Sequence, residues 1–258
     1  MALAPEVSVA TTVVLCLALS GLAYSRNVLT WDGAVAAFVV GLLIGVFGDV
    51  TWLLLLLLFL LSSFAATRYR FALKEAMGVQ EGARGERHAS NVLGNGLAAA
   101  AISVLGFEGF GPVIPKEGSG LLFVSALAVA GADTLASEIG VLSRRVYLIT
   151  NGARVRPGTD GGVSLLGQGA ATAAALYTAL FSFLVLVPFA DWAGFAVSFP
   201  TDPRFLFIPA IVGFLGCQID SVLGATLERR RWLDKKTNNL VSTSLGAAIA
   251  LALYVLIR

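Results

Sequence analysis

Three carboxylates inside long apolar segments are the first candidates for chemistry in this sequence. Asp133 and Glu138 share one such segment, and Asp220 lies in another. On membrane-insertion scales, each acid at the centre of a span costs about 2.5 to 3.5 kcal/mol, so carboxylates placed there need a cation nearby. Asp133 stands eleven positions before Arg144 and Asp220 nine before Arg229, which predicts similar depths for the two aspartates. We therefore expect Asp133 and Asp220 to hold one divalent cation between them.

Small residues beside both aspartates predict that the helices carrying them pack closely. Asp220 falls on a helical stripe with Gly213, Gly216 and Gly224, and Asp133 on a stripe with Ala136 and Gly140. Such faces let two backbones approach and would bring the carboxylates together. Two carboxylates with few other hard ligands suit Mg²⁺, which keeps water molecules and completes its coordination with substrate phosphates. The expected cofactor is therefore Mg²⁺.

The third acid, Glu138, occupies a different face of its helix. It follows Asp133 by five positions, which turns it about 140° away on a straight helix. We expect it to act in catalysis by binding a second metal ion or orienting a water molecule, or else to face a basic residue. Two other interpretations cover all three acids: structural partners of polar groups inside the membrane, or the ion-coupling groups of a transporter.

A glycine-rich loop enters the next apolar segment with the groups that phosphate binding requires. Glycines let backbone N–H groups turn toward an anion, hydroxyls add donors, and the following helix N-terminus adds its dipole. The expected phosphate contacts in this loop are Arg154, Arg156, Gly158, Thr159, Gly161, Gly162 and Ser164. Glycine-rich turns also precede membrane helices that bind no ligand. The loop therefore indicates phosphate binding only in combination with the polar residues expected near it.

Other basic and amide side chains are expected at the same membrane face. They are Arg144 and Arg145 before the glycine-rich loop, and Lys235, Lys236, Asn238 and Asn239 after the segment that carries Asp220. Together these groups would neutralise and hydrogen-bond a polyphosphate above the metal ion. The alternative use of the basic residues is to orient the chain and bind anionic headgroups.

A second polar loop provides candidate substrate contacts. Asn91 and Asn95 are four positions apart and share a helix face, so both could hydrogen-bond a substrate. Ser90 or Asn91 could instead cap the start of that helix. His88 is the only histidine in the chain, which argues against two-histidine metal sites and histidine-based triads.

The elements that must position these residues are transmembrane helices. Of 258 residues, 57% are hydrophobic and 13% are charged, and the mean hydropathy of +0.83 is too high for a soluble domain. A span needs roughly 20 apolar residues, and the candidate runs are 7–25, 33–48, 50–66, 91–106, 119–142, 167–190, 205–227 and 238–257. The second and third runs are short and could form a re-entrant hairpin. We predict an all-α bundle of about eight spans in a single domain, residues 1–258.

The distribution of charge predicts how these spans are oriented. With the N-terminus outside, only Lys116, Arg204 and Arg258 of the 18 basic residues lie outside, as the positive-inside rule requires. The functional groups then gather on the cytoplasmic side. We expect an integral protein of a prokaryotic cell membrane whose active site faces the cytoplasm.

Five motifs occur along the chain: NVLGNG at 91–96, DTLASEIG at 133–140, GTDGGVS at 158–164, GCQIDSVLGA at 216–225 and NNLVS at 238–242. In content and order they resemble an integral-membrane family that includes animal transmembrane protein 19 and plant phytyl phosphate kinase. The chain departs from that pattern at Leu135, where the family has Trp, at Asp160, where it has Asn, and near Glu228, where it has Gln. The layout is also distantly similar to dolichol and phytol kinases and CDP-diacylglycerol synthases.

These resemblances imply a kinase that transfers a phosphoryl group from CTP, or another nucleoside triphosphate, to an isoprenoid monophosphate lipid, giving the diphosphate. Asp133 and Asp220 would hold Mg²⁺, and Ser221 would contact substrate beside Asn91 and Asn95. The alternatives are a cytidylyltransferase that makes a CDP-lipid, and a transporter or scramblase that uses the two aspartates for coupling. We expect no nucleic-acid partner, and the sequence favours no particular oligomeric state.

Overall fold

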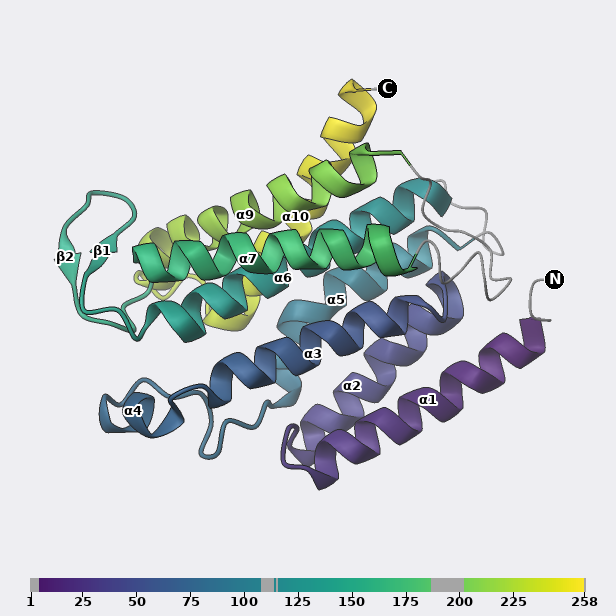
Figure 1. Cartoon of the computed structure of the whole chain (residues 1–258), viewed down its shortest axis with the longest axis horizontal. Coiled ribbons are helices and arrows are strands. Elements are labelled where there is room, and N and C mark those ends of the chain that lie inside the picture. Colours follow the sequence, from purple (N-terminus) through teal and green to yellow (C-terminus); the bar gives the residue numbers. More distant parts are fainter. Residues whose placement is uncertain (1–4, 108–113, 115, 187–201, 258) are drawn as a thin grey trace.

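The computed structural model describes residues 5–107, 114, 116–186 and 202–257, which form a bundle of helices (Figure 1). The first half contains α1 (Pro5–Ser25), α2 (Trp31–Leu43), the π-helical turn η1 (Ile44–Gly48), α3 (Trp52–Arg68), α4 (Phe71–Ala76) and α5 (Ala89–Leu105). The second half contains α6 (Lys116–Gly140), α7 (Leu165–Phe181), η3 (Ser182–Leu186), α9 (Arg204–Leu223), η4 (Gly224–Glu228) and α10 (Lys235–Leu256). Three short strands lie between α6 and α7.

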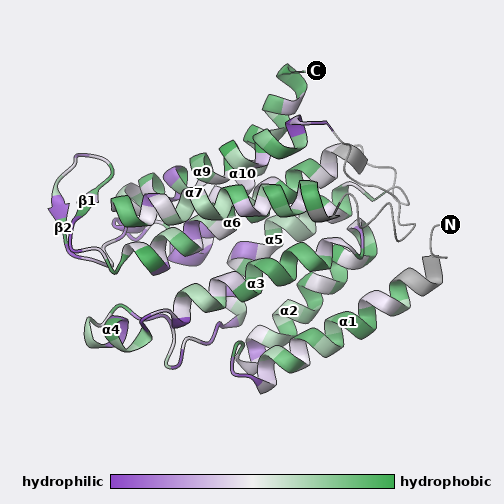
Figure 2. Ribbon diagram, viewed as in Figure 1, coloured by the Kyte–Doolittle hydropathy of each residue, from purple (hydrophilic) through white to green (hydrophobic). Residues whose placement is uncertain are grey.

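The composition of the helices confirms an all-α transmembrane bundle. Within the described residues, four helical stretches are long and apolar enough to span a membrane: Trp31–Gly48, Gly118–Gly140, Arg204–Glu228 and Lys235–Leu256. Val9–Ser25, Trp52–Arg68 and Ala89–Leu105 are shorter apolar helices. Figure 2 shows hydrophobic residues along the helices and hydrophilic ones near α4 and β2. Every predicted apolar run coincides with a helix over its described part, while the count of eight crossings stays a prediction.

Helix α6 forms the centre of the bundle. It packs against α3, α5, α7, α9 and α10, and 83% of its most apolar stretch is buried, against 28–39% in the other three long spans. The outer helices expose large apolar side chains such as Val14, Leu184 and Phe207, as expected where lipid is the solvent. The helix that carries Asp133 is therefore held from all sides.

Glycines set the close contact between α6 and α9. A Cβ atom at Gly213 would lie 2.9 Å from the Cβ of Ala128, and one at Gly216 would lie 2.3 Å from Val129. This confirms the close approach predicted for the Asp220 stripe. On α6, Gly140 at the end of the matching stripe packs against α7, because a Cβ at Gly140 would meet the backbone of Gly167 at 3.0 Å.

The loop between α6 and α7 is an ordered antiparallel sheet. Strand β1 (Val146–Leu148) lies between β2 (Arg154–Val155) and β3 (Gly162–Val163), with Val146 opposite Val155 and Leu148 opposite Gly162. The sequence predicted only a flexible glycine-rich loop here. Strands of two or three residues are too short to show the alternation of apolar and polar residues that predicts a strand from sequence.

Polar loops gather at one end of the bundle. Figure 1 shows α4 and the β1–β2 hairpin at one end of the helices, whereas α1 begins and α10 ends toward the other. The segments that carry the candidate polar residues therefore share one end of the bundle.

Candidate functional site

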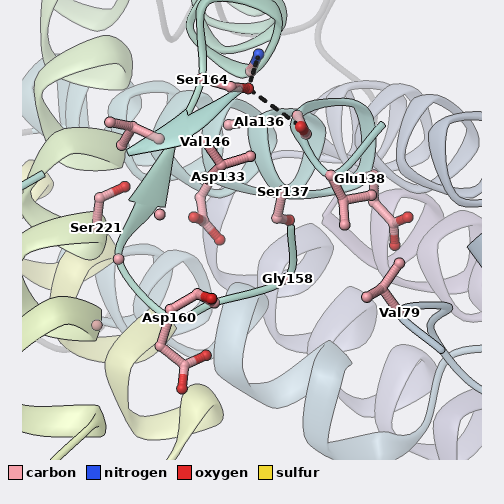
Figure 3. Close-up of a pocket in the computed structure, with 18 of the residues that line it drawn as sticks. Val79, Asp133, Ala136, Ser137, Glu138, Val146, Gly158, Asp160, Ser164 and Ser221 are labelled. Atoms are coloured by element: carbon pink, nitrogen blue, oxygen red, sulfur yellow. Dashed lines mark hydrogen bonds between the residues drawn. The ribbon is translucent and has the colours of Figure 1, made fainter. Parts of the chain in front are cut away.

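A cavity of about 320 Å³ opens at the polar end of α6 and α9. Its walls come from α6, the turn that precedes β3, the start of α7, the end of α9 with η4, the segment after α4, and the first residue of α10. Figure 3 shows the carboxylate of Asp133 directed into this space, with Ser221 and Asp160 on other sides of it. Segments distant in sequence thus meet around one hollow.

Asp133 and Asp220 lie together in this cavity. Their carboxyl groups are direct neighbours that interact with each other, and both side chains line the cavity. Asp220 also accepts a hydrogen bond from the Ser242 hydroxyl on α10, with Oγ 3.0 Å from Oδ1. The structure therefore places the two predicted metal-binding residues side by side, as their spacing required.

Two asparagines at the start of α10, which were predicted to contact phosphate, continue the polar cluster near Asp220, although neither lines the cavity. Asn238 donates from Nδ2 to the Asp220 carbonyl at 3.2 Å and to Glu228 Oε2 at 3.3 Å. Asn239 donates from Nδ2 to Asn95 Oδ1 at 3.2 Å. The Oδ1 atoms of Asn238 and Asn239 are buried and have no hydrogen-bond partner. Buried acceptors without a donor are costly, so these oxygens indicate a missing donor or cation.

Carboxylates dominate the charge of the cavity. In the described part of the chain, the acidic lining residues are Glu81, Asp133, Glu138, Asp160, Asp220 and Glu228, and the basic one is Lys235. Lys235 Nζ lies 3.9 Å from Glu81 Oε2, and its side chain is 58% exposed. An anionic substrate could not enter such a site without added cations, because like charges repel at short range.

Glu138 faces away from the two aspartates and has its own cation. Its Oε2 lies 2.7 Å from Nζ of Lys74, whose side chain is fully buried, and its Oε1 accepts from the Thr67 hydroxyl at 2.9 Å. Lys74 also donates to the carbonyls of Ala66 and Thr67 at the end of α3. Glu138 therefore contacts a basic residue, which is one of the two predicted arrangements. A catalytic role for Glu138 stays a prediction.

Arg87 joins this cluster from the segment before α5. It is 6% exposed, and its Nη2 atom donates to Thr67 Oγ1 at 3.1 Å. Burial lowers the pKa of the Arg87 guanidinium, and the charges of Glu138, Glu81 and Asp133 oppose that change. In the sequence, Lys74 and Arg87 are only part of the charge pattern that predicts membrane orientation, and no local pattern marks them as buried.

The glycine-rich turn forms one wall of the cavity. Gly158 and Gly161 have φ angles of +82° and +70°, a region that glycine adopts without strain. A Cβ at Gly161 would lie 2.4 Å from the backbone nitrogen of Ala225, so this turn docks directly on η4. Gly158, Thr159, Gly161, Gly162 and Ser164, which were predicted to bind phosphate, all line the cavity.

Two hydroxyls of this turn have structural partners. Ser164 caps α7, because its Oγ accepts from the Gly167 nitrogen at 3.1 Å, and it donates to the Gly140 carbonyl at 3.2 Å. Thr159 Oγ1 donates to the Arg156 carbonyl at 2.7 Å. The backbone of the turn is therefore the better candidate for contacts with an anion.

The four predicted arginines lie outside the cavity wall. Arg144, Arg145, Arg154 and Arg156 are exposed on or next to the small sheet, which extends beyond the ends of α6 and α7 (Figure 1). Lys236, unlike Lys235, does not line the cavity either. Phosphate binding by these five residues stays a prediction and would require a substrate that reaches past the cavity mouth.

Asn91 and Asn95, the predicted substrate contacts, have different surroundings. Asn91 Oδ1 accepts from the His88 nitrogen at 3.1 Å, which helps to start α5, and its Nδ2 donates to Glu81 at 2.8 Å. Asn95 is buried against Asn239. The helix-capping alternative therefore describes Asn91, whereas Asn95 accepts from the Asn239 amide on α10.

Comparisons with known proteins agree with this architecture. A model of the family described as integral membrane protein DUF92 matches residues 14–250. An uncharacterized membrane protein of Synechocystis is 32% identical over 241 residues, covering 92% of this chain and 86% of the relative. One from Methanocaldococcus jannaschii is 28% identical over 224 residues, covering 86% and 84%. Protein VTE6 of Arabidopsis thaliana, described as chloroplastic, is 28% identical over 229 residues, covering 86% of this chain and 64% of its own length. No solved structure matches.

The matched region runs from the middle of α1 into the last turns of α10 and therefore includes the whole cavity. The chain belongs to the DUF92 family of integral membrane proteins.

Proposed function

We propose that this protein is a phosphotransferase that moves the terminal phosphoryl group of a nucleoside triphosphate, in the first instance CTP, onto the phosphate of a membrane isoprenoid lipid. The observation that carries the proposal is the contact between the Asp133 and Asp220 carboxyl groups inside an acid-lined cavity at the end of a membrane bundle. The sequence motifs add support through their resemblance to a family that includes plant phytyl phosphate kinase. We place the cavity on the cytoplasmic side, where CTP is present.

The residues of the cavity fit Mg²⁺. The two carboxylates, Asp133 and Asp220, are hard acceptors of the kind that this ion prefers. Among the described residues, no three acidic, histidine or cysteine side chains cluster as a full ligand set. Water molecules and substrate phosphate oxygens would have to complete the coordination of the ion. Bound Mg²⁺ would supply neutralisation of phosphate charge.

The residues of the chain would act mainly by positioning. In the transfer, an oxygen of the lipid monophosphate forms a bond to the γ-phosphorus, the bond from that phosphorus to the β–γ bridging oxygen breaks, and the nucleoside diphosphate leaves. The acceptor phosphate is already an anionic nucleophile near neutral pH, so no general base is required. Lys235 and the backbone of the turn at 158–162 would orient the nucleotide phosphates at the cavity mouth.

A product assay tests the proposal. The purified protein in lipid nanodiscs would be incubated with Mg²⁺, geranylgeranyl or phytyl monophosphate, and CTP or ATP labelled at either the α or the γ position. We expect γ-label in the lipid diphosphate and release of the nucleoside diphosphate. Transfer of α-label to lipid with release of pyrophosphate would make the protein a cytidylyltransferase. An absence of lipid product with every donor would overturn the phosphotransferase assignment.

A further inference from the structure

A second cavity lies between α1 and α3, on the side of the bundle away from α9. It measures about 90 Å³, and its walls are α1 and α3, with α2 and the first half of α5 as the floor. Helices α1 and α3 both flank α2 in Figure 1, and α1 packs mainly on α2. The groove is apolar along almost its whole surface, with residues such as Leu19, Ala37, Leu57 and Leu60.

Several of these residues are half-exposed on the outside of the bundle. Leu19, Ala37, Leu57 and Leu60 are all of this kind. In a membrane protein the outer face meets lipid, so a chain could enter the groove sideways from the bilayer without crossing water. With a volume of about 90 Å³, the groove has room for a stretch of one hydrocarbon chain and not for the two chains of a phospholipid.

The groove ends at a buried cation. Arg87 and Asn91 are its polar lining residues at the end near the site. Although the Arg87 side chain is 6% exposed, its Nε atom has no hydrogen-bond partner. Glu138 is taken by Lys74, and within residues 5–107, 114, 116–186 and 202–257 no carboxylate forms an ion pair with Arg87. A buried guanidinium retains its charge and needs an anion to offset the loss of water.

The backbone of Arg87 is fixed where that anion would bind. Its nitrogen donates to the Val28 carbonyl at 3.0 Å, and its carbonyl accepts from the Thr30 nitrogen at 3.1 Å and the Thr30 hydroxyl at 3.1 Å. The turn between α1 and α2 therefore holds Arg87 in place, which reduces the entropy lost when a ligand binds.

The polar end of the groove adjoins the acidic cavity. Asn91 lines the groove and donates to Glu81, which lines the acidic cavity. The charges of Glu138 and Asp133 also act on Arg87. A phosphate held at Arg87 would thus lie at the border of the two spaces, with its chain in one and its oxygens turned toward the other.

We propose that the α1–α3 groove holds the hydrocarbon chain of a single-chain lipid monophosphate and that Arg87 binds its phosphate. This inference rests on the proposed function and deepens it, because it gives the acceptor a site separate from the residues that would hold the nucleotide. Arginine suits this role, since its planar fork donates two parallel hydrogen bonds to a phosphate.

Direct binding of geranylgeranyl monophosphate, without nucleotide, tests the site independently of turnover. Geranylgeraniol, which lacks the phosphate, is the reference ligand. Ala37→Phe fills the floor of the groove, and Val39→Phe is the matched control, because Val39 is on the same helix, 46% exposed and not part of the groove. We expect Ala37→Phe to weaken binding of both ligands about tenfold or more and Val39→Phe to leave both unchanged.

Arg87 variants test the phosphate contact. Arg87→Gln should remove most of the preference for the monophosphate over the alcohol, about tenfold to a hundredfold, and Arg87→Lys should keep part of it. If Arg87 has only a structural role, Arg87→Gln should change the affinities for both ligands equally. If Arg87→Gln does not fold, Ala37→Phe against Val39→Phe decides the question.

The outcomes test the lipid-binding groove and the phosphoryl-transfer reaction separately. Equal binding by the parent, Ala37→Phe and Arg87→Gln, or no binding by the parent, would overturn the groove as the acceptor site, even if phosphoryl transfer is observed. Variant-sensitive binding without any lipid product would support the groove and leave the phosphotransferase proposal wrong.

Discussion

At the scale of single residues, the site depends on two pairs of charged side chains: Asp133 with Asp220 in the cavity, and Lys74 with Glu138 beside it. Asp133 and Asp220 meet because glycines let α6 and α9 approach, and a stripe of small residues is visible in sequence. Asn238 also bonds to the Asp220 backbone, whereas Asn239 bonds to Asn95, and phosphate contacts by these two asparagines stay a prediction. Lys74 and Arg87 could not be identified as buried residues of the site from the sequence. A basic residue in a loop indicates only membrane orientation unless the fold of that loop is known.

The Lys74–Glu138 pair gives a prediction about stability. Lys74→Met should lower the stability of the protein in detergent by about 3 to 5 kcal/mol, since it leaves the Glu138 carboxylate buried beside fewer donors. The double variant Lys74→Met/Glu138→Gln should recover much of that loss. Thermal unfolding of the three proteins measures the coupling, and additive losses would mean that the two groups do not act as a pair.

At the scale of elements, the apolar runs indicated the helices but not the small sheet or the buried segment before α5. The α6–α7 connection folds because Gly158 and Gly161 adopt positive φ and because the turn rests on η4. These contacts are between segments about 60 residues apart, and no local periodicity encodes them. The arginines predicted to bind phosphate lie outside the cavity because the small sheet extends beyond the ends of α6 and α7, and local periodicity does not encode that sheet either.

The docking of this turn gives a second prediction. Gly161→Ala should impair nucleotide binding, because the new methyl group would meet the backbone of Ala225 and push the turn away from η4. Gly152→Ala is the matched control: its φ of +68° carries a similar backbone cost of about 1 kcal/mol, but nothing lies within 4 Å of the added atom. We expect the KM for nucleotide to rise at least about tenfold for Gly161→Ala alone. Equal values for the two variants would remove the turn from the site.

At the scale of the whole molecule, composition and charge predicted the membrane bundle, and the family match confirms that class. The shared end of the polar loops in Figure 1 agrees with the grouping required by the positive-inside rule. Which side that end faces depends on the membrane, and the fold by itself does not encode it. The groove beside α1 escaped sequence analysis because it depends on how three helices pack together.

Single cysteines test the orientation. In a background without Cys16 and Cys217, cysteines at Pro203 and Ile257 should react with an impermeant thiol reagent added to intact cells, because the charge pattern places both outside. Cysteines at Ala83 and Ala153, which are exposed in the structure near the site, should react only after the membrane is opened. Labelling of Ala153→Cys in intact cells would invert the arrangement and separate the site from cytoplasmic nucleotide.

The most direct test of the account compares activity with stability in Asp133→Asn and Asp220→Asn. Asparagine keeps the shape of each side chain but removes a charge that is costly within a membrane bundle, so without metal each variant should be at least as stable as the parent. Mg²⁺-dependent transfer of γ-label to the lipid phosphate should nevertheless be lost in both. The account predicts this opposition of lost activity and retained or raised stability, measured on the same purified preparations. Full activity in both variants, or unfolding of both where the parent stays folded without Mg²⁺, would contradict it.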